Sequence, residues 1–114
     1  MTHIEPISFE HFKNLDLRTG TILDIDDISN ADVSVFRLTI DFGSLGHRQS
    51  CAQITDHYRP GDLIGRQVVA VVNLPPHRVA GLVSEVLVLG GREDDGSVRL
   101  LMPDKTVANG TRLR

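Results

Sequence analysis

The sequence predicts an all-β fold, a small barrel built from five or more short strands with little helix. Three observations lead to this expectation. Several segments alternate apolar and polar residues with a period of two, turn residues separate these segments at nearly regular intervals, and a single short segment has helical spacing. A small β-sandwich would give the same spacing, so the pattern alone leaves both architectures open.

The length and composition predict one cytoplasmic domain spanning residues 1–114. The chain has 40% apolar residues, no repeat and no linker, which suits one modest core. No apolar run approaches the ~20 residues of a membrane helix, so membrane insertion is not expected. The N-terminus lacks the basic and apolar regions of a secretory signal. Cys51 is the single cysteine, which fits a reducing cytosol.

The first third of the chain predicts a short helix followed by a long strand. Ser8 is a candidate N-cap for a helix over residues 8–14, in which Phe9 and Phe12 lie three residues apart. The strand should begin at residue 17, and a glycine within it, Gly20, predicts a bend or bulge. One face of this strand should hold the residues of one parity: Leu17, Thr19, Thr21, Leu23 and Ile25.

The middle of the chain predicts two more strands and a loop. Residues 35–43 alternate, and residues 48–54 follow as a third strand. In the loop over residues 55–65 we expect a helical turn after Thr55 and a tight turn at Pro60-Gly61. One face of the second strand should hold its apolar residues: Phe36, Leu38, Ile40 and Phe42.

The last part predicts a buried strand, a further strand and a hairpin. Residues 66–74 are β-branched and nearly continuous, and Pro75-Pro76 ends them. A strand over residues 84–91 should form a hairpin with "VRLLMP" across the polar turn "REDDGS". Asn109-Gly110 is a strong turn signal before a short last strand. A five-stranded Greek-key barrel of the OB type is the leading candidate.

The chemistry-bearing residues give little support for an enzyme or a metal site. The five histidines are scattered and lack metal-ligand spacing, and Cys51 reads best as a buried thiol. The segment "LGGREDDG" lacks the Lys-Ser/Thr of a phosphate loop. We therefore expect no catalysis, no metal and no cofactor.

The charge distribution is a weak sign of nucleic-acid binding. The formal net charge is −3, but residues 44–81 hold four arginines and two acids. Solvated loop charges would explain this equally well. The four arginines are Arg48, Arg59, Arg66 and Arg78.

Several polar residues on the expected strands form a candidate rim. The hypothesis is that Ser50, Asn73, Arg78, Ser84 and Glu85 converge there, with Ser84 and Glu85 as the exposed start of the strand over residues 84–91. The alternative is that Asn73 and Ser84 satisfy backbone groups at a barrel corner. Both hypotheses stay open at this point.

Five segments together carry a resemblance to a known family. The sequence resembles the stand-alone tRNA-binding-domain family, and within it the export-related chaperones of the CsaA type, from about Phe9 to Leu113. It keeps the Ser-Glu of the family motif at Ser84 and Glu85 and has Val86-Leu87 in place of Gly-Met. The segments are "FKNLDLRTGTI", "LTIDFG", "RQSCAQIT", "YRPGDLIGRQVVAVVNLPPHRVAGLVSEVLVLGG" and "PDKTVANGTRL".

The resemblance implies an OB barrel whose terminal extensions build a homodimer. It implies tRNA binding of low sequence specificity and, in the CsaA branch, binding of unfolded or pre-export polypeptides with links to the SecA export pathway. The tRNA-binding positions it implies are Arg48, Ser50, Asn73, Arg78, Ser84 and Glu85. For an apolar peptide pocket near the barrel mouth and the dimer seam, we expect Phe36, Ile54, Leu74, Val79 and Leu82.

Two departures from the family bear on the RNA half of this expectation. Asp56 and His57 stand where relatives often have basic residues, and aromatic residues for base stacking are scarce. The leading expectation is therefore a cytosolic, homodimeric, polypeptide-holding chaperone. A tRNA-binding module and a purely structural subunit are the alternatives.

Overall fold

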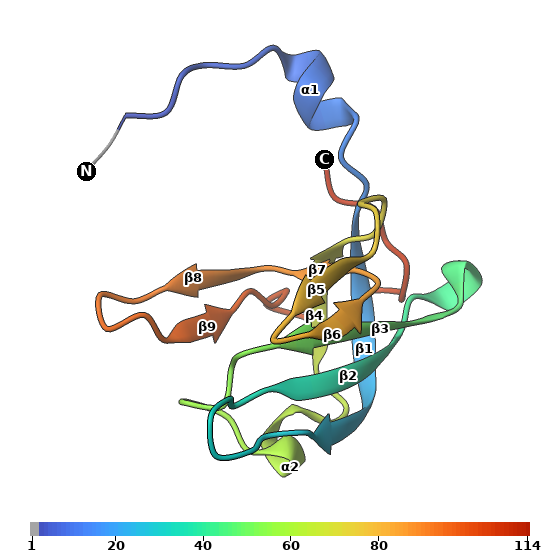
Figure 1. Ribbon diagram of the computed structural model, residues 1–114. Coiled ribbons are helices and arrows are strands. Elements are labelled where there is room, and N and C mark those ends of the chain that lie inside the picture. Colours follow the sequence, from blue (N-terminus) through green and yellow to red (C-terminus); the bar gives the residue numbers. More distant parts are fainter. Residues whose placement is uncertain (1–2) are drawn as a thin grey trace.

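A strongly curved antiparallel sheet of five strands forms the centre of the molecule (Figure 1). The computed structural model describes residues 3–114. The strand order is β3-β2-β1-β4-β7. These strands are β1 (Leu17–Asp27), β2 (Phe36–Asp41), β3 (His47–Ala52), β4 (Gln67–Val71) and β7 (Leu87–Val88). The nearly closed barrel confirms the prediction of an all-β fold of the OB type.

Two hairpins and three short helices complete the described chain. One hairpin pairs β5 (His77–Val79) with β6 (Leu82–Ser84), and the other pairs β8 (Gly90–Arg92) with β9 (Val98–Leu100). The second hairpin projects from the barrel (Figure 1). The helices are α1 (Phe9–Lys13), a 3-10 turn (Gly43–Leu45) and α2 (Pro60–Leu63). No helix among residues 3–114 combines the length and the apolar character needed to cross a membrane.

The long strand β1 organises the barrel because two strands share it. Residues 17–21 pair with β4, and residues 21–27 pair with β2. A register shift between Ile22 and Asp24 turns the second half of β1 over. The prediction of one continuous face is therefore wrong: Ile22 and Ile25 are buried, whereas Leu23 is 43% exposed. The bend was expected at Gly20, but the register shift lies two to four residues further along the strand.

The core lies between the two halves of the curved sheet. Every residue of β4 is buried, as its continuous apolar character predicts. The expected face of β2 is confirmed, because its apolar side chains all point into this core. The central cluster consists of Ile22, Ile25, Phe36, Leu38, Ile40, Phe42, Ile54, Leu63, Val68, Ala70 and Val86.

The loop before β4 differs from the expectation. The helical turn predicted after Thr55 lies further along, at α2, and Pro60-Gly61 begins this helix instead of forming a separate tight turn. Proline suits a first helical position because that residue needs no N–H partner. The Asp62 carboxylate accepts a hydrogen bond from the Arg59 backbone N–H at 3.2 Å, which helps to hold the start of the helix.

The strand predicted over residues 84–91 is divided into parts of β6, β7 and β8. Ser84 ends β6, where it pairs with His77 across a tight hairpin. Ala80 and Gly81 form the turn of that hairpin, and both have positive φ, at 51° and 83°. Two such residues in succession are typical of a type I′ turn. The local hairpin thus takes Ser84 out of the apolar run that follows it.

The N-terminal arm, residues 3–13, leads away from the barrel and contains α1 (Figure 1). Residues 9–13 form α1, slightly shorter than the predicted 8–14, and the Ser8 carbonyl accepts a hydrogen bond from the His11 backbone N–H at 3.1 Å. The Ser8 hydroxyl makes no capping bond, and no residue of α1 is buried. The arm is therefore the least packed part of the described chain.

Candidate functional site

Ser84 joins β6 to β3 across the seam of the barrel. Its side chain is fully buried. The hydroxyl accepts a hydrogen bond from the Cys51 backbone N–H at 3.0 Å and donates one to the Val86 carbonyl at 2.8 Å. The expectation that Ser84 begins a strand at an exposed entrance is wrong, because Ser84 ends a hairpin and faces the interior.

Glu85 closes the same seam from the outside. Its backbone N–H donates to the Gln49 carbonyl at 2.9 Å, and its carboxylate accepts from the Gln49 backbone N–H, also at 2.9 Å. Glu85 and Gln49 thus pair as two residues of an antiparallel ladder do, except that the Glu85 carboxylate replaces one backbone carbonyl. A carboxylate precedes this apolar strand because it satisfies an edge N–H of β3.

Ser50 and Asn73 are also bonded within the fold. The Ser50 hydroxyl is buried and donates to the Val86 carbonyl at 3.3 Å. The Asn73 side chain accepts from the Asp16 backbone N–H at 2.9 Å and donates to the Asn14 carbonyl at 2.7 Å. These bonds favour the alternative that Asn73 and Ser84 satisfy backbone groups. The rim is therefore divided: Ser50 and Ser84 meet at the seam, and Asn73 bonds to the base of the arm.

Two expected cations lie near the seam. Arg48 is half-buried on β3, opposite Ile40. Arg78 is exposed on β5, and its guanidinium donates to the Gly81 carbonyl at 2.9 Å. Among the residues that the structure describes, neither arginine forms an ion pair with a carboxylate. Both retain donors for a phosphate group.

The five residues expected in a peptide pocket fall into three groups. Phe36 and Ile54 belong to the core and do not reach the surface. Val79 and Leu82 are half-buried and pair with each other beside the hairpin turn. Leu74 is exposed and lines a surface cavity of about 390 Å³.

The cavity at Leu74 has an apolar wall that sequence reasoning missed in part. Its other lining residues are Pro75, Pro76, His77 and Leu87. Leu87 was expected inside an apolar strand, but β7 is short and leaves it 40% exposed. Val83 on β6 is 50% exposed. The signal in the sequence was the Pro-Pro corner, because a central strand does not continue through prolines, and both prolines line this cavity.

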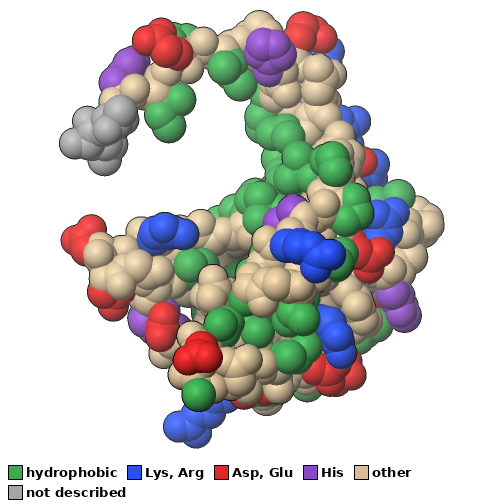
Figure 2. All heavy atoms as spheres, in the orientation of Figure 1, with side chains coloured by type: hydrophobic (Ala, Val, Ile, Leu, Met, Phe, Trp, Pro, Cys, Tyr) green, Lys and Arg blue, Asp and Glu red, His purple; other side chains and the backbone are tan. Residues whose placement is uncertain are grey.

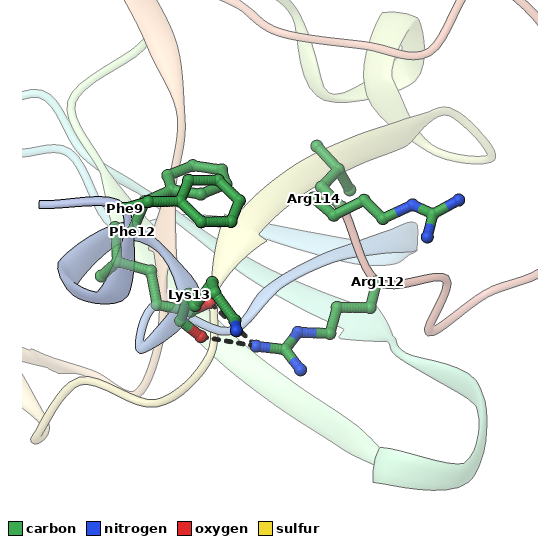
Figure 3. A pocket seen from close by; sticks show the side chains of 7 residues that line it. Phe9, Phe12, Lys13, Arg112 and Arg114 are labelled. Carbon is green, nitrogen blue, oxygen red and sulfur yellow. Dashed lines mark hydrogen bonds between the residues drawn. The ribbon is translucent and has the colours of Figure 1, made fainter.

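A second apolar cavity lies between α1 and the C-terminal segment (Figure 3). Its volume is about 380 Å³. Phe9 and Phe12 stack with ring centroids 6.1 Å apart, and Lys13 lies 5.9 Å from the Phe9 ring. Figure 2 shows apolar side chains in a column that leads from α1 down to the barrel. The lining residues are Phe9, Phe12, Lys13, Leu15, Arg112, Leu113 and Arg114.

A serine, a histidine and an aspartate meet where the loop before α2 touches the β8–β9 hairpin. His57 Nε2 lies 2.7 Å from Ser97 Oγ, which donates to Asp95 at 2.6 Å. In a hydrolytic triad the carboxylate bonds to the histidine, whereas here it bonds to the serine. Ser97 is buried, so this set serves to hold the hairpin. The hydrogen bonds from Ser97 lower the pKa of the Asp95 carboxyl.

No three His, Cys, Asp or Glu side chains gather in a metal-binding group within residues 3–114. Burial raises the pKa of the Cys51 thiol, whose sulfur lies 3.5 Å from the Val83 carbonyl. A raised pKa reduces the thiolate fraction and hence the nucleophilicity of this group. Cys51 thus behaves as a small core residue at the seam.

Comparison with known proteins gives matches along nearly the whole chain. Residues 17–112 match the family described as "Putative tRNA binding domain". A crystal structure of chaperone CsaA from Bacillus anthracis str. Ames is 54% identical, with a TM-score of 0.91, over 96% of this chain and 100% of that chain. A CsaA chaperone protein from Picrophilus torridus is 39% identical, with a TM-score of 0.84 and the same coverage.

The curated relatives are longer proteins. A methionine–tRNA ligase of Porphyromonas gingivalis is 41% identical over 110 residues. The match includes 96% of this chain and 16% of the ligase. The chain therefore spans about one sixth of the length of this relative.

Proposed function

The chain belongs to the tRNA-binding-domain family, and from this premise we propose that it is a chaperone of the CsaA type that binds unfolded or pre-export polypeptides. The observation that carries the proposal is the likeness to the Bacillus anthracis CsaA structure, at 54% identity over 100% of that chain. The chaperone would bind its clients non-covalently in the cytoplasm. It would then transfer pre-export clients to the SecA pathway.

The cavity at Leu74 is the proposed contact for the polypeptide. Leu74 and Leu87 offer exposed apolar surface around a corner that Pro75 and Pro76 hold rigid. Covering exposed apolar surface of this kind with an extended client lowers the free energy, because it removes that surface from water. Such contacts discriminate little between sequences, which suits a holder of many unfolded chains.

The N-terminal arm supports the proposal of a homodimer. Ile4 is 84% exposed and Phe9 is 70% exposed, and α1 leaves an apolar cavity beside the C-terminal segment. A second copy that covers these residues would remove apolar surface from water. Two copies would also present two polypeptide cavities, so a long client would gain avidity.

Substitution of the cavity wall tests polypeptide binding. Leu74→Asp and Leu87→Asp should each weaken binding of a labelled, permanently unfolded polypeptide by at least about tenfold, which corresponds to ~1.4 kcal/mol. Fluorescence anisotropy measures this affinity. Ile64→Asp is the matched control, because Ile64 is an exposed apolar residue on another part of the barrel. Wild-type affinity in both cavity variants would reject this site.

Binding of tRNA is the second candidate, favoured by the family match and by the methionine–tRNA ligase relatives. Arg48 and Arg78 are the proposed phosphate contacts. If each arginine neutralises one phosphate, Arg48→Gln and Arg78→Gln should each lower the magnitude of the slope of log K for tRNA against log salt concentration by about one. Fluorescence anisotropy across salt concentrations measures this slope. Arg92→Gln, on the projecting hairpin, is the control. Equal salt slopes in all proteins would exclude these contacts.

A further inference from the structure

The base of the N-terminal arm is held by side chains from two distant segments. The helix α1 ends at Lys13, and the last carbonyls of a helix lack partners within it. Asn73 Nδ2 donates to the Asn14 carbonyl at 2.7 Å. Arg112 Nη2 donates to the carbonyls of Lys13 at 2.8 Å and Leu15 at 3.4 Å (Figure 3). Two side chains thus cap three successive carbonyls.

Asp16 fixes the same base from its other side. Its backbone N–H donates to Asn73 Oδ1 at 2.9 Å, and its carbonyl accepts from the Val72 N–H at 2.9 Å. Its carboxylate accepts from Arg18 Nε at 2.6 Å and lies 3.6 Å from Arg112 Nε. The chain therefore passes from the arm into β1 through a corner at which the N–H, the carbonyl and the carboxylate of Asp16 are all hydrogen-bonded.

This corner joins the arm to the barrel. An isolated helix of five residues is far too short to be stable in water, and α1 has no buried residue to hold it against the barrel. We propose that Asn73 and Arg112 are positioning residues that set the direction of the arm and thereby shape the surface it offers to a second copy. The second half of this statement rests on the proposed homodimer.

The proposal gives Asn73 a role different from RNA contact. Both polar groups of its side-chain amide already bond to the backbone of the arm base. Loss of this side chain should therefore alter any ligand binding through the arm. Asn73 also directly precedes the wall of the Leu74 cavity, so the arm base and that cavity share one segment of chain.

Trypsin cleavage of the Lys13–Asn14 bond tests the positioning role without reference to a dimer. The Lys13 side chain is 57% exposed, but cleavage requires the surrounding backbone to open locally. We expect Asn73→Ala and Arg112→Gln each to accelerate this cleavage about tenfold. Cleavage after Arg92, in the separate β8–β9 hairpin, should keep its wild-type rate in both variants and so shows that the effect is confined to the arm, while circular dichroism checks that the barrel is folded.

Two further substitutions serve as controls. Arg114→Gln removes a cation from the same segment as Arg112, and Gln53→Ala removes an exposed amide; neither should change the rate at Lys13. If Asn73→Ala fails to fold, Arg112→Gln still decides the question. Wild-type cleavage at Lys13 in a folded Asn73 or Arg112 variant overturns the proposal.

Sedimentation equilibrium then tests the effect on assembly. If the wild type is a dimer, both variants should raise its Kd at least tenfold, while Gln53→Ala, which lies outside the α1 cavity, leaves it unchanged. A monomeric wild type would reject the proposed homodimer and leave the positioning role to the cleavage result. A dimer with unaltered Kd in variants that cleave faster would reject the link between the arm direction and assembly.

Discussion

The hydroxyl of Ser84 accepts a hydrogen bond from the backbone N–H of Cys51, 33 residues earlier in the chain. Both residues are buried at the seam where β6 meets β3. Side-chain hydrogen bonds, together with the single backbone bond from Glu85 to Gln49, therefore close this side of the barrel. Removing the Ser84 hydroxyl leaves the buried Cys51 N–H without a partner.

Ser84→Ala should destabilise the protein by about 1–3 kcal/mol, the usual cost of an unsatisfied buried donor. Urea unfolding monitored by circular dichroism measures the change. Ser44→Ala, at an exposed serine of the 3-10 turn, is the matched control and should change stability little. Equal midpoints for both variants would mean that the seam does not depend on the Ser84 hydroxyl.

Gly20→Ala should also destabilise, because no room exists for a methyl group there. A Cβ at Gly20 would lie 2.6 Å from Ile40 Cγ2 and 2.8 Å from two carbons of the Phe42 ring. Overpacking of this kind costs about 1–3 kcal/mol. Gly61→Ala has open space around the new methyl and is the control. The idea fails if chemical denaturation gives the two variants the same stability.

Ala80→Asn should stabilise the protein. Ala80 is the only described non-glycine residue with positive φ, at 51°. Asparagine tolerates this region better than alanine, whose Cβ is crowded by the backbone, so a gain of about 0.5–1 kcal/mol is expected. Ala31→Asn, in an exposed loop with ordinary φ, is the control for the change of side chain. A lower melting temperature for Ala80→Asn would contradict the assignment of the turn.

Asp95→Asn should remove a pH-dependent part of the stability. The Ser97 hydroxyl and backbone N–H hydrogen bonds lower the pKa of the Asp95 carboxyl. A lowered folded-state pKa contributes stability that is fully present above the ordinary carboxyl pKa and is lost as the pH falls through the folded-state pKa. The wild-type advantage over Asp95→Asn should therefore be constant near neutral pH and shrink in acid.

Urea unfolding from pH 7 to pH 2 would measure this difference. Asp94→Asn, at the neighbouring exposed residue of the same turn, serves as the control and should follow the wild type. An advantage of the wild type over Asp95→Asn that grows on acidification would have the wrong sign and would exclude the hydrogen-bonded carboxylate as its source.

The regular parts of the barrel follow from the sequence because their burial has a simple period. The alternation in β2 and the continuous apolar run in β4 report directly which faces meet the core. The long β1 is different. Its bulge reverses the facing of Leu23, and the side chains alone do not reveal such a shift because the pairing with β2 determines it.

The candidate site was less predictable than the fold. Residue types singled out Ser84 and Glu85, but not their roles at the seam, because their partners Cys51 and Gln49 lie on a strand far away in the sequence. The position of Ser84 at the end of β6 depends on a hairpin turn at Ala80. Alanine rarely adopts positive φ, so the sequence does not indicate a turn there. The exposure of Leu87 likewise follows from the shortness of β7.

The first strand also meets the last part of the described chain. The Thr19 N–H donates to the Thr111 carbonyl, the Thr19 carbonyl accepts from Gly110, and the Leu113 N–H donates to the Leu17 carbonyl. During synthesis on the ribosome, one edge of β1 therefore stays open until residues 110–113 have emerged from the exit tunnel. Because contacts this distant in sequence form slowly, the nascent barrel exposes an unpaired edge that nascent-chain chaperones would be expected to cover.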